Sequence, residues 1–187
     1  MSQSLLLKIV RESIAEVFEA KKIINKEELL HEYPILNEPL ACFVHIYIDN
    51  ELRGSSGKIE SSSSLLDAII YHAKIAAFQD KAFEPLSVAQ YLRARIQLSL
   101  FTPLVELHYQ SIEEVPSQLT PNEDGLYLSF NQKSAFILPQ AWSQYPNPNT
   151  FVAHLIQQSE LNETELSSHP KFFSFQVETS IDDPILT

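Results

Sequence analysis

The spacing of apolar residues changes repeatedly along the chain between the period of a helix and that of a strand. Amphipathic helices are predicted where apolar residues recur every three or four positions, at residues 3–21, 65–78 and 149–160. Strands are predicted where β-branched and aromatic residues gather or alternate with polar ones, at residues 42–48, 93–102, 126–130, 134–138 and 171–179. Helices and strands do not alternate strictly. The pattern therefore favours an α+β fold, with a mixed, mostly antiparallel sheet flanked by helices, over a doubly wound fold.

Polar residues mark two predicted helix starts. Asn25, with Glu28 three positions later, predicts a short helix that ends at Glu32. Ser64 and Asp67 stand in the same relation and resemble a capping box at the start of the strongest predicted helix.

The strand-like segments carry further local expectations. A hairpin is predicted about residues 131–133, and residues 58–60 are predicted to form another short strand. In the segment 171–179, three apolar side chains are predicted to share one face of a strand: Phe173, Phe175 and Val177.

Composition limits the class of protein. The chain has 187 residues, 44% of them hydrophobic and 20% charged, which is typical of a globular protein and excludes a disordered one. A chain of this length buries roughly 70% of its surface on folding, so one domain over residues 1–187 is expected. The single cysteine, Cys42, excludes an intramolecular disulfide, and its apolar neighbours predict a core residue rather than a reactive thiol.

The same sequence carries no predicted membrane or export segment. Its longest charge-free apolar run, residues 39–48, is too short to span a bilayer. The N-terminal residues lack the basic region of a signal peptide, so a cytoplasmic location is expected.

Charge disfavours two classes of partner. The chain has 13 Lys and Arg against 24 Asp and Glu, a net charge of -11. Nucleic-acid binding needs a basic surface that neutralises phosphates, and the pair Arg93 and Arg95 is too small for one. We therefore expect neither nucleic acid nor a membrane as a partner, while a local cationic pocket stays open.

Glycine is scarce, with three in the chain against a usual frequency of ~7%. Gly54 and Gly57 lie three positions apart in residues 52–58 (LRGSSGK), which we predict to be a loop that follows a strand. At least one of the two is expected at positive φ. Consecutive N–H groups of such a loop can bind an anion, with Arg53 or Lys58 as counter-charge. The alternative is a tight connection between strands, in which the glycines serve only the turn.

Serine and histidine chemistry is the main alternative to binding. Ser55 or Ser56 would be a nucleophile if a base lay within hydrogen-bond reach, and His45 is the nearest histidine in the sequence. His45 alternates with Phe43 and Tyr47, however, which favours a packed histidine over a base. The other histidines are scattered without the spacing of metal ligands, so neither a metal site nor a cofactor is predicted: His31, His72, His108, His154 and His169.

Several of these segments together resemble the AMMECR-type domain, a family also called AmmeMemoRadiSam system protein A. The family's hallmark is a strand followed by an LRGCIG loop, which corresponds to residues 52–57 (LRGSSG). An alanine-rich helix that runs into AAFxDxxFxPL corresponds to residues 76–86 (AAFQDKAFEPL). Further matches follow in the family's order, at residues 96–103 (IQLSLFTP), 125–126 (GL), 138–140 (LPQ) and 151–152 (FV). The match is strongest over residues 40–162.

The resemblance implies an α+β protein with a larger and a smaller subdomain, and with the LRGSSG segment facing a cleft between them. It implies no established reaction. Family members occur alone or beside a Memo-like protein and a radical-SAM protein, which the resemblance implies as partners in a modification system. We expect a small anionic ligand or a protein partner to bind in the cleft. The residues expected at this site, the last two carried over from matching motifs, are Arg53, Gly54, Ser55, Ser56, Gly57, Lys58, Asp80 and Gln140.

The chain departs from the family pattern within the hallmark segment. Ser55 stands where the family has cysteine, Ser56 where it has isoleucine, and Lys58 where it has threonine. An unactivated serine hydroxyl is a far poorer nucleophile than a thiolate. The alternatives to a binding module are a hydrolase or transferase that uses Ser55, and a structural subunit of the modification system. Arg53 is expected to bind the ligand, and its alternative role is to pair with a nearby acid: Asp49, Glu51 or Glu60.

Overall fold

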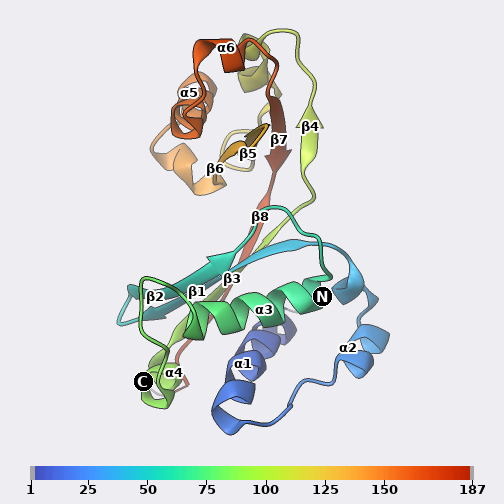
Figure 1. Ribbon diagram of the computed structural model, residues 1–187, viewed down its shortest axis with the longest axis vertical. Coiled ribbons are helices and arrows are strands. Elements are labelled where there is room, and N and C mark those ends of the chain that lie inside the picture. The colour runs from blue at the N-terminus through green and yellow to red at the C-terminus, as the bar shows by residue number, and fades with distance from the viewer. Residues whose placement is uncertain (1–2, 186–187) are drawn as a thin grey trace. The chain divides into compact units, whose positions relative to one another are not determined.

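The computed structural model describes residues 3–185 and contains two four-stranded sheets with flanking helices, an α+β architecture (Figure 1). The chain divides into two compact units. The first combines the residues up to Phe101 with those from Glu178 onward, and the second is Thr102–Val177. Each unit has a hydrophobic core of its own. Within the described residues, no helix combines the length and the apolar character needed to cross a bilayer.

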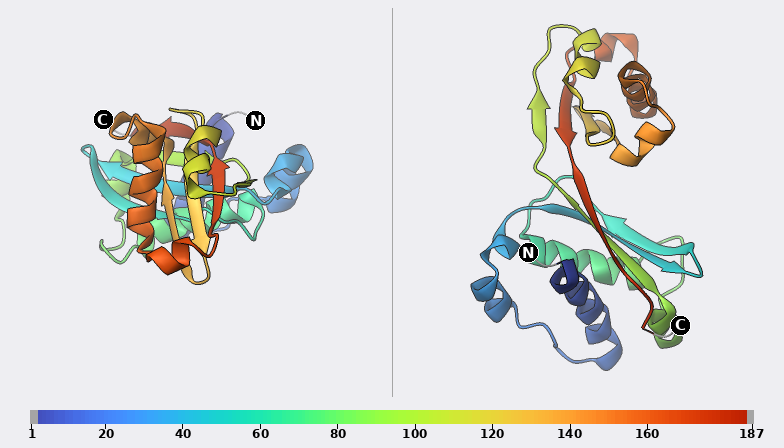
Figure 2. Two further views of the ribbon diagram at one scale, coloured as in Figure 1. Left: turned by 90° about the horizontal axis from the view of Figure 1, so that it is seen from above. Right: turned by 180° about the vertical axis from the view of Figure 1, so that it is seen from behind.

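The sheet of the first unit has helices on one face. Its strand order is β2-β1-β3-β8, with strands β1 (Ala41–Ile48), β2 (Glu51–Gly57), β3 (Arg95–Phe101) and β8 (Val177–Asp182). β1 pairs antiparallel with both β2 and β3. Helices α1 (Gln3–Glu19) and α3 (Leu65–Phe78) lie against the same face of this sheet, as the views of Figures 1 and 2 agree.

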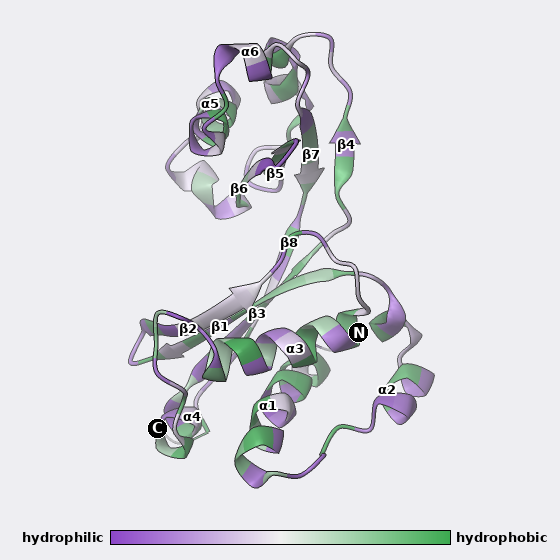
Figure 3. Ribbon diagram, viewed as in Figure 1, coloured by the Kyte–Doolittle hydropathy of each residue, from purple (hydrophilic) through white to green (hydrophobic). Residues whose placement is uncertain are grey.

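Strand β1 supplies the centre of this core because its side chains alternate between the two faces of the sheet. Cys42, Val44 and Ile46 are buried in the core with α1 and α3. Phe43 and His45 lie on the opposite face. Figure 3 shows the matching mixture of apolar and polar residues along α1 and α3, and most of the residues that these helices bury are apolar.

Side-chain caps set the helix starts where the sequence predicts them. Asn25 accepts a hydrogen bond from the backbone N–H of Glu28, and α2 (Lys26–Glu32) follows. Ser64 accepts from the backbone N–H of Asp67 at the start of α3. Both predictions are confirmed. The remaining helices of this unit are the 3-10 helix η1 (Pro34–Asn37) and α4 (Val88–Arg93).

The second unit builds its core around a sheet of order β4-β7-β5-β6. Its strands are β4 (Val105–Leu107), β5 (Gly125–Phe130), β6 (Lys133–Ile137) and β7 (Lys171–Phe175). Its helices are η2 (Ile112–Gln118), η3 (Pro139–Ser143), α5 (Pro148–Ser159) and α6 (Glu163–Leu166). Trp142 stacks on Phe151 with ring centroids 3.9 Å apart in the core. The β5–β6 hairpin turns at Asn131, whose φ is 55°, so the predicted hairpin is confirmed.

The prediction of one strand over residues 171–179 is wrong. Two strands, β7 and β8, occupy the segment and belong to different sheets. Gln176 separates them because its backbone hydrogen-bonds to Thr102, accepting from that residue's N–H at 3.0 Å and donating to its hydroxyl at 2.8 Å. Val177 belongs to β8, so the three residues predicted to share one face of a strand do not lie on one strand.

Candidate functional site

Residues 51–57, predicted as a loop, form the edge strand β2 instead. The turn lies earlier, at Asp49 and Asn50, whose φ values are 52° and 66°. Positive φ at both central residues is what a tight hairpin between twisted strands requires. No described glycine has a positive φ, so that prediction is wrong. The short strand predicted at residues 58–60 is also absent, because the chain leaves the sheet after Gly57.

Close packing explains the two glycines of β2. A Cβ at Gly54 would overlap the backbone carbonyl oxygen of Ala76 in α3. A Cβ at Gly57 would overlap the ring of Phe43 on β1. The glycines therefore allow helix and neighbouring strand to approach β2, rather than allowing an unusual backbone conformation.

Asp80 binds the outer edge of β2, so the expected nest of free N–H groups does not form. Its Oδ2 accepts from the backbone N–H of Ser55 at 2.8 Å and lies 3.4 Å from the Ser55 hydroxyl. Its Oδ1 accepts from the backbone N–H of Ala82 at 2.9 Å. The hydrogen bonds from Ala82 and Ser55 lower the pKa of Asp80. The carboxylate is therefore a structural acceptor and a poor base for Ser55.

Arg53 lies between β2 and the segment that joins α3 to α4. Its guanidinium donates to the carbonyl of Glu84 at 2.7 Å and to the side chain of Gln90 at 3.3 Å. It also lies 5.5 Å from the ring centroid of Phe83. Of the three acids considered as alternative partners of Arg53 (Asp49, Glu51 and Glu60), Asp49 binds Arg93 instead, at 2.7 Å.

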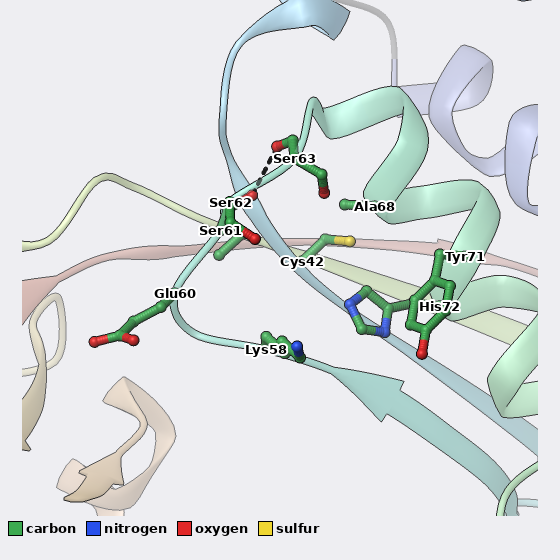
Figure 4. Close-up of a pocket in the computed structure, with 10 residues that line it drawn as sticks. Cys42, Lys58, Glu60, Ser61, Ser62, Ser63, Ala68, Tyr71 and His72 are labelled. Carbon is green, nitrogen blue, oxygen red and sulfur yellow. Dashed lines mark hydrogen bonds between the residues drawn. The ribbon is translucent and has the colours of Figure 1, made fainter. Parts of the chain in front are cut away.

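A pocket of about 160 Å³ opens where the chain leaves β2 and passes the first turns of α3 (Figure 4). The groups that line it are Ala41, Cys42, Lys58, Glu60, Ser61, Ser62, Ser63, Ala68, Tyr71 and His72. Of the eight residues expected at a ligand site, only Lys58 lines this pocket. Gln140 lies in the second unit, where it lines a different pocket with Gln176.

His72 is the residue that sequence reasoning missed. It lies on the face of α3 that packs against the sheet and is 7% exposed. Its Nδ1 is 2.8 Å from the hydroxyl oxygen of Ser56 on β2. Burial lowers the pKa of His72, and the Lys58 ammonium lowers it further, so the imidazole is neutral at neutral pH.

A signal for this pair was present in the sequence. Ser56 and Gly54 are two positions apart and therefore share the face of β2 that meets α3. His72 follows the buried Ile69 by three positions, which places it on the buried face of α3. The sequence does not show, however, that β2 packs against α3.

A family model described as AMMECR1 matches residues 7–180. The chain belongs to the AMMECR1 family. Among similar proteins, one from Sulfolobus acidocaldarius is 32% identical over 154 residues, which cover 79% of this chain and 66% of that protein. Protein TV1384 of Thermoplasma volcanium is 32% identical over 126 residues, or 65% of this chain and 62% of that protein. The match therefore spans less than two thirds of either relative.

The AMMECR1 fold is also seen in a solved structure. The crystal structure of the uncharacterized protein PH0010 from Pyrococcus horikoshii superposes with a TM-score of 0.76. The match covers 98% of this chain and 93% of that chain at 23% sequence identity. At this sequence identity, the similarity between the two proteins concerns the fold alone.

Two other side chains of this AMMECR1 protein that could react, those of Cys42 and His45, are packed against neighbouring residues. Burial raises the pKa of the Cys42 thiol to about 12, which confirms the prediction of a core cysteine. His45 lies opposite Ser55 across the β1–β2 pair, but its ring stacks with Phe43 and Tyr47. Its Nδ1 is buried and has no hydrogen-bond partner in the part of the chain that the structure describes. The described residues contain no group of three or more His, Cys, Asp or Glu side chains that could hold a metal ion.

Proposed function

We propose that this AMMECR1-family protein binds a small anionic ligand in the pocket between the end of β2 and α3. The observation that carries the proposal is that Lys58, His72 and the three consecutive serines at residues 61–63 line one pocket. Lysine supplies a point charge for an oxyanion, and hydroxyl and imidazole groups supply hydrogen bonds. The overall charge of -11 makes such a local cation uncommon in this chain.

Glu60 is the one acidic residue among the groups that line the pocket. Figure 4 shows its carboxylate directed away from Lys58 and His72. The cation therefore stays available to a ligand, and the volume of about 160 Å³ suits a ligand no larger than a few heavy atoms beyond its anionic group. Carboxylate, sulfate and phosphate groups fit this description.

Calorimetric titration of the full chain with sodium sulfate and sodium phosphate tests the proposal. Both are expected to bind the wild type, and Lys58→Met is expected to weaken binding by roughly tenfold or more, the usual effect of losing a charged hydrogen bond. Lys81→Met is the matched control, because Lys81 is an exposed lysine of the same unit that does not line the pocket. The control corrects for the general effect of these salts on protein stability. Equal affinity of wild type and Lys58→Met, or no binding of either anion, contradicts the proposal.

A second candidate, a hydrolase, is favoured by the 2.8 Å contact between Ser56 and His72. We place it second because Ser56 is not among the groups that line the pocket. The expected alternative nucleophile, Ser55, has the carboxylate of Asp80 at 3.4 Å and no hydrogen bond to a histidine among the described residues. A fluorophosphonate probe is therefore expected to leave the protein unlabelled. Stoichiometric labelling that is lost in Ser55→Ala or Ser56→Ala would establish the hydrolase and identify its serine.

A further inference from the structure

We infer that Ser56 holds His72 in the tautomer whose Nε2–H faces the pocket, so that the pocket selects oxyanions that carry no proton. The inference rests on the proposed function for its ligand and adds the chemical class of that ligand. Ser56 acts in it as a positioning residue, since it touches His72 and does not line the pocket.

The contact between Ser56 and His72 is fixed by the close approach of β2 to α3. Gly54, on the same face of β2, packs directly on the Ala76 carbonyl, which leaves no room for a longer side chain there. This approach places the Ser56 hydroxyl oxygen 2.8 Å from Nδ1. The pair is therefore part of the strand–helix packing rather than a contact between two mobile side chains.

Hydrogen-bond accounting assigns the proton of the ring. The Ser56 hydroxyl can donate to or accept from Nδ1 of His72 at 2.8 Å, and the inferred tautomer is the one in which the hydroxyl donates. A hydroxyl that donates to Nδ1 leaves the ring proton on Nε2, because a neutral imidazole carries one proton. The neutral form is the one favoured by burial and by the Lys58 ammonium, which lower the pKa of His72.

Nε2 is the ring nitrogen of His72 that faces the pocket. Figure 4 shows one ring nitrogen of His72 toward β2 and the other toward the pocket residues. Among the described residues, Nε2 has no hydrogen-bond partner. The Lys58 ammonium and an Nε2–H repel each other, and an anion bound between them offsets that repulsion.

A ligand in this pocket meets donors at Lys58 and His72, so its best group accepts hydrogen bonds at every oxygen. Sulfate and carboxylate groups do this at neutral pH. A hydrogen phosphate keeps a P–OH, which cannot face either of these two donors and has to turn toward a serine hydroxyl or the Glu60 carboxylate of the lining. We therefore expect the pocket to prefer sulfate to hydrogen phosphate, although the two ions have nearly the same size and shape.

Competition between sulfate and phosphate at about pH 8, where both are dianions, tests the selectivity by calorimetry. The wild type is expected to bind sulfate more tightly. In Ser56→Ala the ring is free to present an unprotonated Nε2, and the ratio of the two affinities is expected to fall roughly threefold to tenfold, the range of one hydrogen bond. Ser56→Thr keeps a hydroxyl at the position and is expected to restore the ratio. Ser99→Ala, which removes a strand hydroxyl bonded to Thr179, is the control and leaves the ratio unchanged.

Nitrogen-15 NMR of the histidine side chains tests the tautomer without any ligand, with His72→Gln to assign the signal. The wild type is expected to show a protonated Nε2 and a hydrogen-bonded, unprotonated Nδ1, and Ser56→Ala to shift the Nδ1 resonance. A proton on Nδ1 in the wild type overturns the inference even if both anions bind. Absence of binding with the expected tautomer overturns the proposed function and with it the selectivity. An affinity ratio that is the same in wild type and Ser56→Ala overturns the role of Ser56.

Discussion

At the scale of the single residue, Gly54 shows that a glycine can be required for close packing rather than for an unusual backbone conformation. Its φ is not positive, yet any Cβ would meet the Ala76 carbonyl of α3. A backbone carbonyl cannot swing aside as the end of a flexible side chain can. The position therefore tolerates glycine alone unless β2 and α3 move apart.

Gly54→Val is expected to lower the free energy of unfolding by about 3 kcal/mol, because overpacking forces the strand from the helix. Urea denaturation monitored by circular dichroism measures the change. Glu51→Val is the control, since Glu51 is an exposed residue of the same strand and valine favours strands. Equal stability of Gly54→Val and wild type would refute the close-packing explanation.

A second single residue, Asp80, makes the free energy of unfolding depend on pH. Hydrogen bonds from Ala82 and Ser55 lower its pKa, so its folded-state pKa lies below the unfolded one. Its contribution is therefore present above the ordinary aspartate pKa and is lost as the pH falls through the lowered folded-state value. Asp80→Asn is expected to lower stability at neutral pH by about 1 kcal/mol and to change it little at the acid end of that window. Denaturation curves at several pH values measure this, and a loss that is equal at every pH would argue against the linkage.

At the scale of the element, β2 is an edge strand whose outer side is occupied. Asp80 accepts a hydrogen bond from the backbone N–H of Ser55. Arg53 donates a hydrogen bond to the carbonyl of Glu84, in the segment that follows α3. An uncovered edge strand is a template for pairing with another chain. Here the segment between α3 and α4 protects it.

Arg53→Ala is expected to release that segment. The contacts to Glu84, Gln90 and the Phe83 ring favour a clear fall in melting temperature, with sulfate binding at the Lys58 pocket retained because Arg53 does not line it. Hydrogen exchange should also become faster in residues 79–87. Unchanged melting together with lost anion binding would instead support the ligand-binding role expected for Arg53 from the sequence.

The elements differ in how far the sequence could predict them. Helix α3 matches its predicted bounds because a serine cap and an apolar stripe are both local signals. The division of residues 171–179 between two sheets could not be predicted, because the break depends on a contact between Gln176 and the distant Thr102. The same holds for the contact between Ser56 and His72. Ser56 and His72 are 16 positions apart, and their meeting depends on which helix packs against which strand.

At the scale of the whole molecule, the first unit is assembled from both ends of the chain. β8 adds the last strand of its sheet next to β3. Arg11 of α1 binds this C-terminal segment through the Asp182 carboxylate at 2.6 Å and the Asp183 carbonyl at 2.9 Å. It also donates to the carbonyls of Tyr91 and Ala94, and it is 8% exposed.

Arg11→Leu is expected to lower the free energy of unfolding by about 3 kcal/mol, because the change strips three buried or part-buried carbonyls of their donor. Limited proteolysis should then cut residues near β8 first, as the sheet loses its hold on that strand. Lys8→Leu, which removes an exposed cation from the same helix, is the control. An unchanged denaturation midpoint for Arg11→Leu would show that β8 is held by its pairing alone.

The division of the first unit between the two ends of the chain has a consequence for synthesis on the ribosome. Arg11 is translated 171 residues before Asp182, whereas every residue of Thr102–Val177 has been added before residues 178–182 of β8 are. The second unit therefore has its complete sequence while the first unit still lacks a strand. The edge of β3 and the guanidinium of Arg11 have no partner in β8 until that strand has been translated, so the nascent protein passes through a stage in which the second unit has its full sequence and the first unit does not.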